Sequence, residues 1–87
     1  MATIGFEPPV GILLGRPGQR RAVSSLREAA DCLMNPDWPE RGSDAFHTAF
    51  VALIAASDGL VDADKARLAF AEAAKEAGIL VEEKLMH

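Results

Sequence analysis

The chain has 87 residues, 49% hydrophobic and 25% charged, with a formal net charge of −4. This composition is typical of a globular protein and excludes a disordered chain. Residues 1–43 carry five basic and five acidic side chains, and residues 44–87 carry four basic and eight acidic ones. Such an acidic balance argues against nucleic acid as a partner. We expect a single domain over residues 1–87, and chains this small often gain stability by oligomerising.

Three features point to the cytoplasm and away from membranes. The single cysteine, Cys32, cannot form an intramolecular disulfide and suits a reducing compartment. Residues 1–15 lack a basic start and are interrupted by prolines, so they do not have the pattern of a signal peptide. No stretch reaches the roughly 18 apolar residues that a membrane-spanning helix needs. We therefore expect a cytoplasmic protein without membrane contact.

The beginning of the chain predicts an extended lead-in over residues 1–8, followed by a β-hairpin. Two consecutive prolines near its end exclude helix there. Alternating apolar residues over Val10–Leu14 predict a strand, and Gln19–Val23 would be the returning strand. The dipeptide Pro17-Gly18 between them fits the central positions of a type II turn, where only glycine readily takes a positive φ.

Three helices and a closing strand are expected after the hairpin. Ser25 and Glu28 form a capping box at the start of the first helix. Glycines at the ends of the second and third helices suit the left-handed position that follows a helix. The predicted helices are Ser25–Met34, Asp44–Ser57 and Ala63–Ala77, followed by a short strand at Ile79–Val81 and a frayed tail at 82–87. The order β-β-α-α-α-β predicts an α+β fold, with a small three-stranded sheet packed on the helices.

The second predicted helix, Asp44–Ser57, is the most unusual stretch. It holds one acid, at its start, and no lysine, arginine or glutamate. Phe46, Ala49, Phe50, Leu53 and Ile54 form the expected core stripe, while the reverse side carries Thr48, Val51, Ala52 and Ala55. A helix that is apolar all round must be covered all round, by its own domain or by another chain.

A homodimer is the expected solution for this surplus of apolar surface. In the third helix Leu68 lies among charged residues, where a monomer gains nothing from burying it. We expect Val51 and Leu68 to make the contact between two copies, most simply with two-fold symmetry. The alternative is that the chain's own sheet covers the second helix. The residues identify no further protein partner.

The residues that could carry chemistry do not form a catalytic or metal-binding pattern. A nucleophilic Cys32 would need a histidine beside it, but His47 lies mid-helix and His87 is the last residue. The three aspartates near one loop lack the order and the final glutamate of a calcium loop: Asp58, Asp62 and Asp64. We expect no enzyme, no catalytic residue, no metal and no cofactor.

Two binding sites remain open from the sequence. Arg16, Arg20 and Arg21 could contact phosphate, which makes weak anion or nucleic-acid binding the alternative function. They could instead only keep a strand edge from pairing with other strands. Trp38 and Arg67 could form a pocket with the guanidinium over the indole ring. Alternatively, Trp38 closes one end of the core and Arg67 is solvated.

The order and spacing of several short motifs resemble a family of small bacterial proteins, the domain of unknown function 982. The motifs lie between residues 9 and 81 and are a Pro9-Val10 strand start, Ser25-Leu-Arg-Glu-Ala-Ala30, Trp38-Pro39, Ala66-Arg67-x-x-Phe70, Ala73-Ala74-x-Glu76-Ala77-Gly78-Ile79 and Val81. Similar members often have serine before the third helix, where this chain has Asp62. The resemblance implies a compact α+β domain and assigns no activity, cofactor or catalytic residue.

Overall fold

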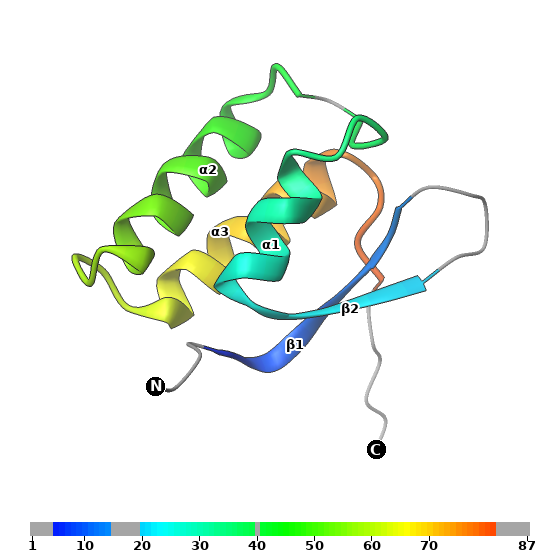
Figure 1. Cartoon of the computed structure of the whole chain (residues 1–87). Coiled ribbons are helices and arrows are strands. Elements are labelled where there is room, and N and C mark those ends of the chain that lie inside the picture. Colours follow the sequence, from blue (N-terminus) through cyan, green and yellow to red (C-terminus); the bar gives the residue numbers. More distant parts are fainter. Residues whose placement is uncertain (1–4, 15–19, 40, 82–87) are drawn as a thin grey trace.

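The computed structural model describes residues 5–14, 20–39 and 41–81. An antiparallel pair of strands is followed by three helices (Figure 1). The elements are β1 (Gly5–Leu13), β2 (Arg20–Ser25), α1 (Leu26–Leu33), α2 (Asp44–Ser57) and α3 (Ala63–Glu76). The expected α+β class is confirmed, and α2 has the predicted bounds. Within the described ranges, no helix is both long and apolar enough to cross a membrane.

The strand β1 begins at Gly5, within the stretch that was expected to be a lead-in. Gly5 pairs with Ser25, and regular pairing resumes at Val10, opposite Val23. The irregularity between these pairs contains the two prolines, which cannot donate to a strand ladder and are tolerated where the ladder is interrupted. The predicted turn at Pro17-Gly18 lies outside the described residues.

The predicted third strand is reduced to a single bridge beside β1. Leu80 forms an isolated antiparallel bridge with Ile12. The Leu13 N–H donates to the Ile79 carbonyl at 2.8 Å, and the Val81 N–H donates to the Gly11 carbonyl at 2.9 Å. The sheet proper therefore has two strands, with the closing segment lying along its β1 edge. The predicted tail at 82–87 lies outside the described residues.

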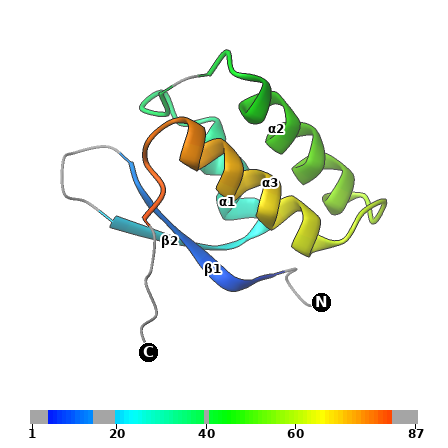
Figure 2. The same cartoon turned by 180° about the vertical axis from the view of Figure 1, so that it is seen from behind.

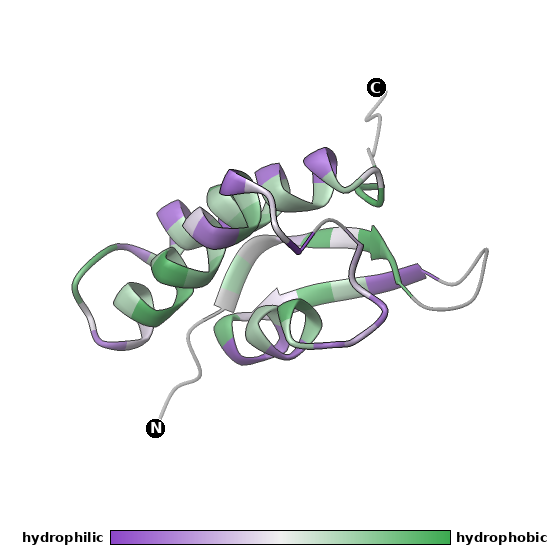
Figure 3. Ribbon diagram, turned by 90° about the horizontal axis from the view of Figure 1, so that it is seen from above, coloured by the Kyte–Doolittle hydropathy of each residue, from purple (hydrophilic) through white to green (hydrophobic). Residues whose placement is uncertain are grey.

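The core lies between the hairpin and the three helices, which cover one face of it (Figure 2). Hydrophobic residues run along the strands where these pass beside the helices (Figure 3). The largest fully buried side chains come from both layers: Ile12 and Val23 from the strands, and Cys32, Leu33 and Phe70 from the helices. Phe6 is also buried and packs on Phe70, with ring centroids 6.1 Å apart. This extends the core to the start of β1.

Serine side chains fix the starts of two helices. Ser25 Oγ accepts from the Glu28 N–H at 3.1 Å, as a capping box requires. The Glu28 carboxylate, however, accepts from the Ser24 N–H at 2.8 Å, one residue earlier than expected. At α2, Ser43 Oγ accepts from the Phe46 N–H at 3.0 Å. These bonds satisfy backbone donors that have no partner inside the helix.

Candidate association surface

The two sides of α2 meet very different surroundings. Its buried side chains are Ala49, Leu53 and Ala56, which face the rest of the chain. On the opposite side Val51 is 50% exposed and Ile54 is 51% exposed. The sheet of the described chain therefore does not cover this outer side. The alternative of a second helix enclosed by its own domain is contradicted for these two residues.

An apolar groove runs between the outer side of α2 and α3. Its volume is about 390 Å³, and its lining residues are His47, Thr48, Val51, Ala52, Ala55, Val61 and Lys65. Leu68 lies one turn beyond Lys65 on the same face of α3, and it is 54% exposed. Of the two residues predicted to make a contact between copies, Val51 lines this groove and Leu68 is exposed on α3 beyond its lining residues.

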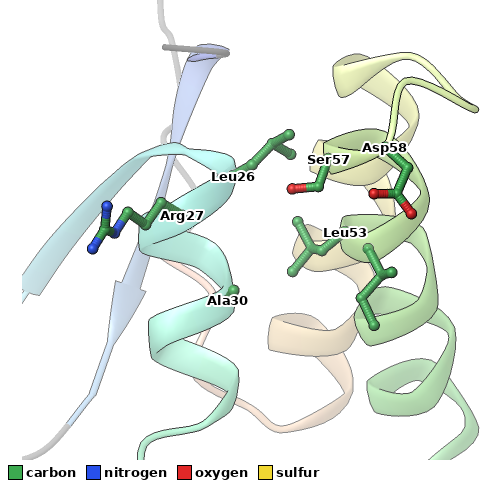
Figure 4. A pocket seen from close by; sticks show the side chains of 7 residues that line it. Leu26, Arg27, Ala30, Leu53, Ser57 and Asp58 are labelled. Atoms are coloured by element: carbon green, nitrogen blue, oxygen red, sulfur yellow. The ribbon is translucent and has the colours of Figure 1, made fainter.

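A second groove, of about 550 Å³, separates α2 from α1 (Figure 4). Leu26 and Ala30 line it from α1, and Leu53 and Ile54 line it from α2. Its remaining lining residues are polar: Arg27, Ser57 and Asp58. Ser57 and Asp58 project from the α2 wall, whereas the Arg27 guanidinium extends away from α2 (Figure 4). This groove is therefore apolar in the middle and polar toward one end.

Trp38 is packed in the core and does not form a pocket with Arg67 among the described residues. The indole is 2% exposed, and its centroid lies 5.6 Å from that of Phe70 and 6.2 Å from that of Phe46. Arg67 forms an ion pair with Asp64 at 3.1 Å. Trp38 Nε1 is buried with no hydrogen-bond partner within the described ranges. The ring thus joins the loop after α1 to both α2 and α3.

The two described hairpin arginines, Arg20 and Arg21, do not share one face of β2. Arg20 and Arg21 are both exposed, but adjacent strand residues point to opposite faces. Hydrogen bonds from Ser24 lower the pKa of the Glu28 carboxyl, and the nearby Arg21 lowers it further. Arg21 therefore stands beside an anion of its own chain. Arg16 lies outside the described residues.

Cys32 and His47 are not brought together. Cys32 is fully buried in α1, whereas His47 is exposed on α2 and lines the groove beside α3. Burial raises the pKa of the Cys32 thiol, which favours the protonated form over the nucleophilic thiolate. Among the described residues, no group of three or more histidine, cysteine, aspartate or glutamate side chains could hold a metal ion.

Ile54 is the residue that the sequence pattern misplaced. It was expected in the core stripe with Leu53, yet half of it is exposed. The buried side of α2 is centred on Ala49 and Ala56, which lie two turns apart on the same face of the helix. Alanines also stand on the outer side, at Ala52 and Ala55, so neither hydropathy nor residue size in the sequence locates the inner side.

Comparison with known proteins gives a family but no characterised relative. No curated protein and no solved structure matches the chain. The family model described as Protein of unknown function (DUF982) matches residues 8–81, which include every helix described above. The chain therefore belongs to this family.

Proposed function

We propose that this protein is a small cytoplasmic module without enzymatic activity, and that it acts by associating with a second copy of itself. The contact is formed by the outer side of α2 and the neighbouring face of α3. Association with further proteins would follow from the dimer. The single cysteine supports the cytoplasmic assignment.

The observation that carries this proposal is the pair Val51 and Leu68. Each is about half exposed, at 50% and 54%, and the groove between their helices is lined mainly by apolar side chains. Burying the exposed half of such a side chain contributes roughly 1 kcal/mol. In a two-fold contact this contribution to the free energy of association occurs twice for each residue, because the same patch is present on both copies.

The proposal that the protein has no enzymatic activity rests on the burial and the raised thiol pKa of Cys32, the candidate nucleophile. Cys32 is enclosed in the core and its thiol pKa is raised, so it is neither accessible nor ionised at neutral pH. His47, the one histidine among the described residues, lines the proposed contact surface instead.

Light scattering after size-exclusion chromatography, over a series of protein concentrations, tests the proposal. We expect the wild-type chain to have the mass of two chains at the higher concentrations. Val51→Asp and Leu68→Asp should shift the mass toward one chain, because each places a carboxylate in an apolar contact. Arg20→Asp, an exposed change on β2, should leave the mass unchanged. A wild-type mass of one chain throughout would contradict the proposal.

A further inference from the structure

The outer edge of β2 has no neighbouring strand within the described ranges. There the sheet consists of β1 and β2, and Leu80 of the closing segment bridges to Ile12 on the opposite edge of β1. The exposed residues of the β2 edge include Arg20, Arg21 and Ala22. An unpaired strand edge presents backbone N–H and C=O groups to which another extended chain can bond.

The hydrogen bonds of β1 indicate which β2 residues direct their backbone groups outward. The β1 residues before and after Ile12 bond to the closing segment, so Ile12 itself directs its N–H and C=O groups to β2. Ile12 lies opposite Arg21. Arg21 therefore bonds to β1, whereas its neighbours Arg20 and Ala22 direct their N–H and C=O groups away from the sheet.

One position of this edge is already bonded to a carboxylate. Ser24, the next residue that faces outward, donates its N–H to Glu28 Oε1 at 2.8 Å. This bond agrees with the alternation, because an N–H that faced β1 would bond within the sheet instead. α1 begins directly after β2 (Figure 1), so the edge ends here. The backbone groups of Arg20 and Ala22 are the part of the edge that a partner can reach.

A second copy of the same edge is a poor partner for these groups. A two-fold axis at Arg20 or Arg21 would place like charges directly opposite each other, which destabilises a strand pair. An axis at Ala22 would pair Arg20 with the other copy's Ser24. The N–H of that serine is already occupied by Glu28. The edge is therefore protected against pairing with itself, and its charge favours a partner of opposite sign.

We propose that β2 accepts an extended segment of another protein as an added strand, and that this segment carries two consecutive acidic residues. Arg20 and Arg21 lie on opposite faces of β2, so consecutive acidic side chains, one on each face of the added strand, would each meet one arginine. The backbone of the segment would bond to Arg20 and Ala22. In this mode of recognition, backbone bonds give affinity and side chains give specificity. The contact is independent of the proposed dimer, because no β2 residue lines either groove.

Binding of short peptides, measured by fluorescence anisotropy at low salt, tests the proposal. The probe is the peptide Gly-Thr-Val-Glu-Glu-Val-Thr-Gly, labelled at its amino terminus and amidated at its carboxyl terminus. A second peptide with lysine in place of both glutamates should bind at least about tenfold more weakly, because like charges repel. A third peptide, methylated on both glutamate backbone nitrogens, keeps the charge but loses a donor at either edge. It should also bind at least about tenfold more weakly.

Ala22→Pro and Ala22→Thr form a matched pair on the protein side. Proline removes the outward N–H without removing a bond to β1, so the variant should fold but bind the acidic peptide about tenfold more weakly. Threonine keeps the N–H and favours strands, so Ala22→Thr should bind within about twofold of wild type. Arg21→Pro removes an N–H that bonds to β1 and should instead lower the unfolding temperature. Circular dichroism during heating measures the folding of each variant.

Arg20→Asp should weaken binding of the acidic peptide about tenfold while the mass of the protein stays unchanged. Equal binding of the acidic and lysine peptides, or of the acidic and methylated peptides, would overturn the proposal. The methylated peptide decides the role of the backbone even if Ala22→Pro does not fold. Tighter binding of a single-stranded thymidine oligonucleotide, unchanged in Ala22→Pro, would assign the arginines to nucleic acid instead. A mass that falls in Ala22→Pro would assign the edge to a second copy. A wild-type chain that never dimerises would overturn the proposed dimer and leave the peptide result unaffected.

Discussion

Both the inner and the outer side of α2 carry hydrophobic side chains, but only those of the inner side are buried. Leu53 is buried, whereas Ile54, the next residue, is half exposed. On the inner side, the small side chains of Ala49 and Ala56 are buried and leave room for close helix packing. Hydropathy alone therefore does not identify the side of α2 that packs within the chain.

The outer side of α1 is polar, unlike the outer side of α2. Arg27, Glu28 and Asp31 are exposed there, so this helix is suited to water on one side and to the core on the other. In α2 the outer side has Val51 and Ile54 instead. Changes on the inner side should therefore alter folding, and changes on the outer side should alter association.

The largest expected loss of folding stability comes from removing the Trp38 ring, which packs against Phe46 of α2 and Phe70 of α3. Trp38→Ala should lower the free energy of unfolding by about 3–5 kcal/mol, the usual cost of removing a large buried aromatic. The ring is 2% exposed and lies against Phe70 and Phe46. Urea unfolding followed by circular dichroism measures this loss, which is a large part of a small domain's stability.

Trp38→Phe should cost much less than Trp38→Ala. Phenylalanine keeps most of the apolar contact and removes the buried Nε1–H, which has no partner within the described ranges. Removing an unpaired buried donor offsets part of the lost packing. Equal losses in the two variants would mean that the indole N–H has a role of its own.

The adjacent pair Leu53 and Ile54 gives the sharpest comparison of the two sides. Leu53→Ala should lower the free energy of unfolding by about 2–5 kcal/mol, because it removes buried methyl groups. Ile54→Ala should change it by less than about 1 kcal/mol, since surface changes are usually small. Chemical denaturation of both variants at concentrations where the protein is monomeric measures the difference. Similar losses would show that the outer side is covered within one chain.

The sequence was sufficient for the elements that carry local signals. Helix bounds follow from Ser25, Ser43 and the two glycines whose φ values are 78° and 76°, Gly59 and Gly78. These signals act over a few residues, so they can be read without the fold. The exposed positions of Val51 and Leu68 also agree with expectation.

What could not be predicted depends on contacts between distant segments. Phe6 is buried because it meets Phe70, a partner 64 positions away that no local pattern connects to it. Leu80 forms a bridge with Ile12 of β1, which is also distant in the sequence. Ile54 is exposed although it continues the large apolar stripe of the sequence, because large apolar residues occur on both sides of α2. The grooves depend on how three helices meet, which hydropathy alone does not encode.

A smaller effect is expected from the cap that holds the start of α2 in place. Ser43 Oγ accepts from the Phe46 N–H at 3.0 Å. Ser43→Ala leaves that donor without its partner and should lower the free energy of unfolding by about 1 kcal/mol. Ser43→Asp should recover most of the loss, because a carboxylate accepts the same bond and agrees with the helix dipole. Thermal unfolding of the three proteins compares these effects, and an unchanged Ser43→Ala variant would contradict the capping role.

The smallest expected effect lies on the polar outer side of α1 and depends on pH. Hydrogen bonds from the Ser24 N–H and hydroxyl hold the pKa of Glu28 below its ordinary value. A carboxyl whose folded-state pKa is depressed contributes its stabilisation fully above the unfolded-state pKa and loses it as the pH falls through the folded-state value. Glu28→Gln can still accept from Ser24 but does not titrate. The stability advantage of wild type over Glu28→Gln should therefore be present at neutral pH and shrink in acid, while the other carboxyls contribute alike to both proteins. Thermal unfolding of the pair across the acid range measures this, and a difference that does not change with pH would show that the charge of Glu28 contributes nothing to the cap.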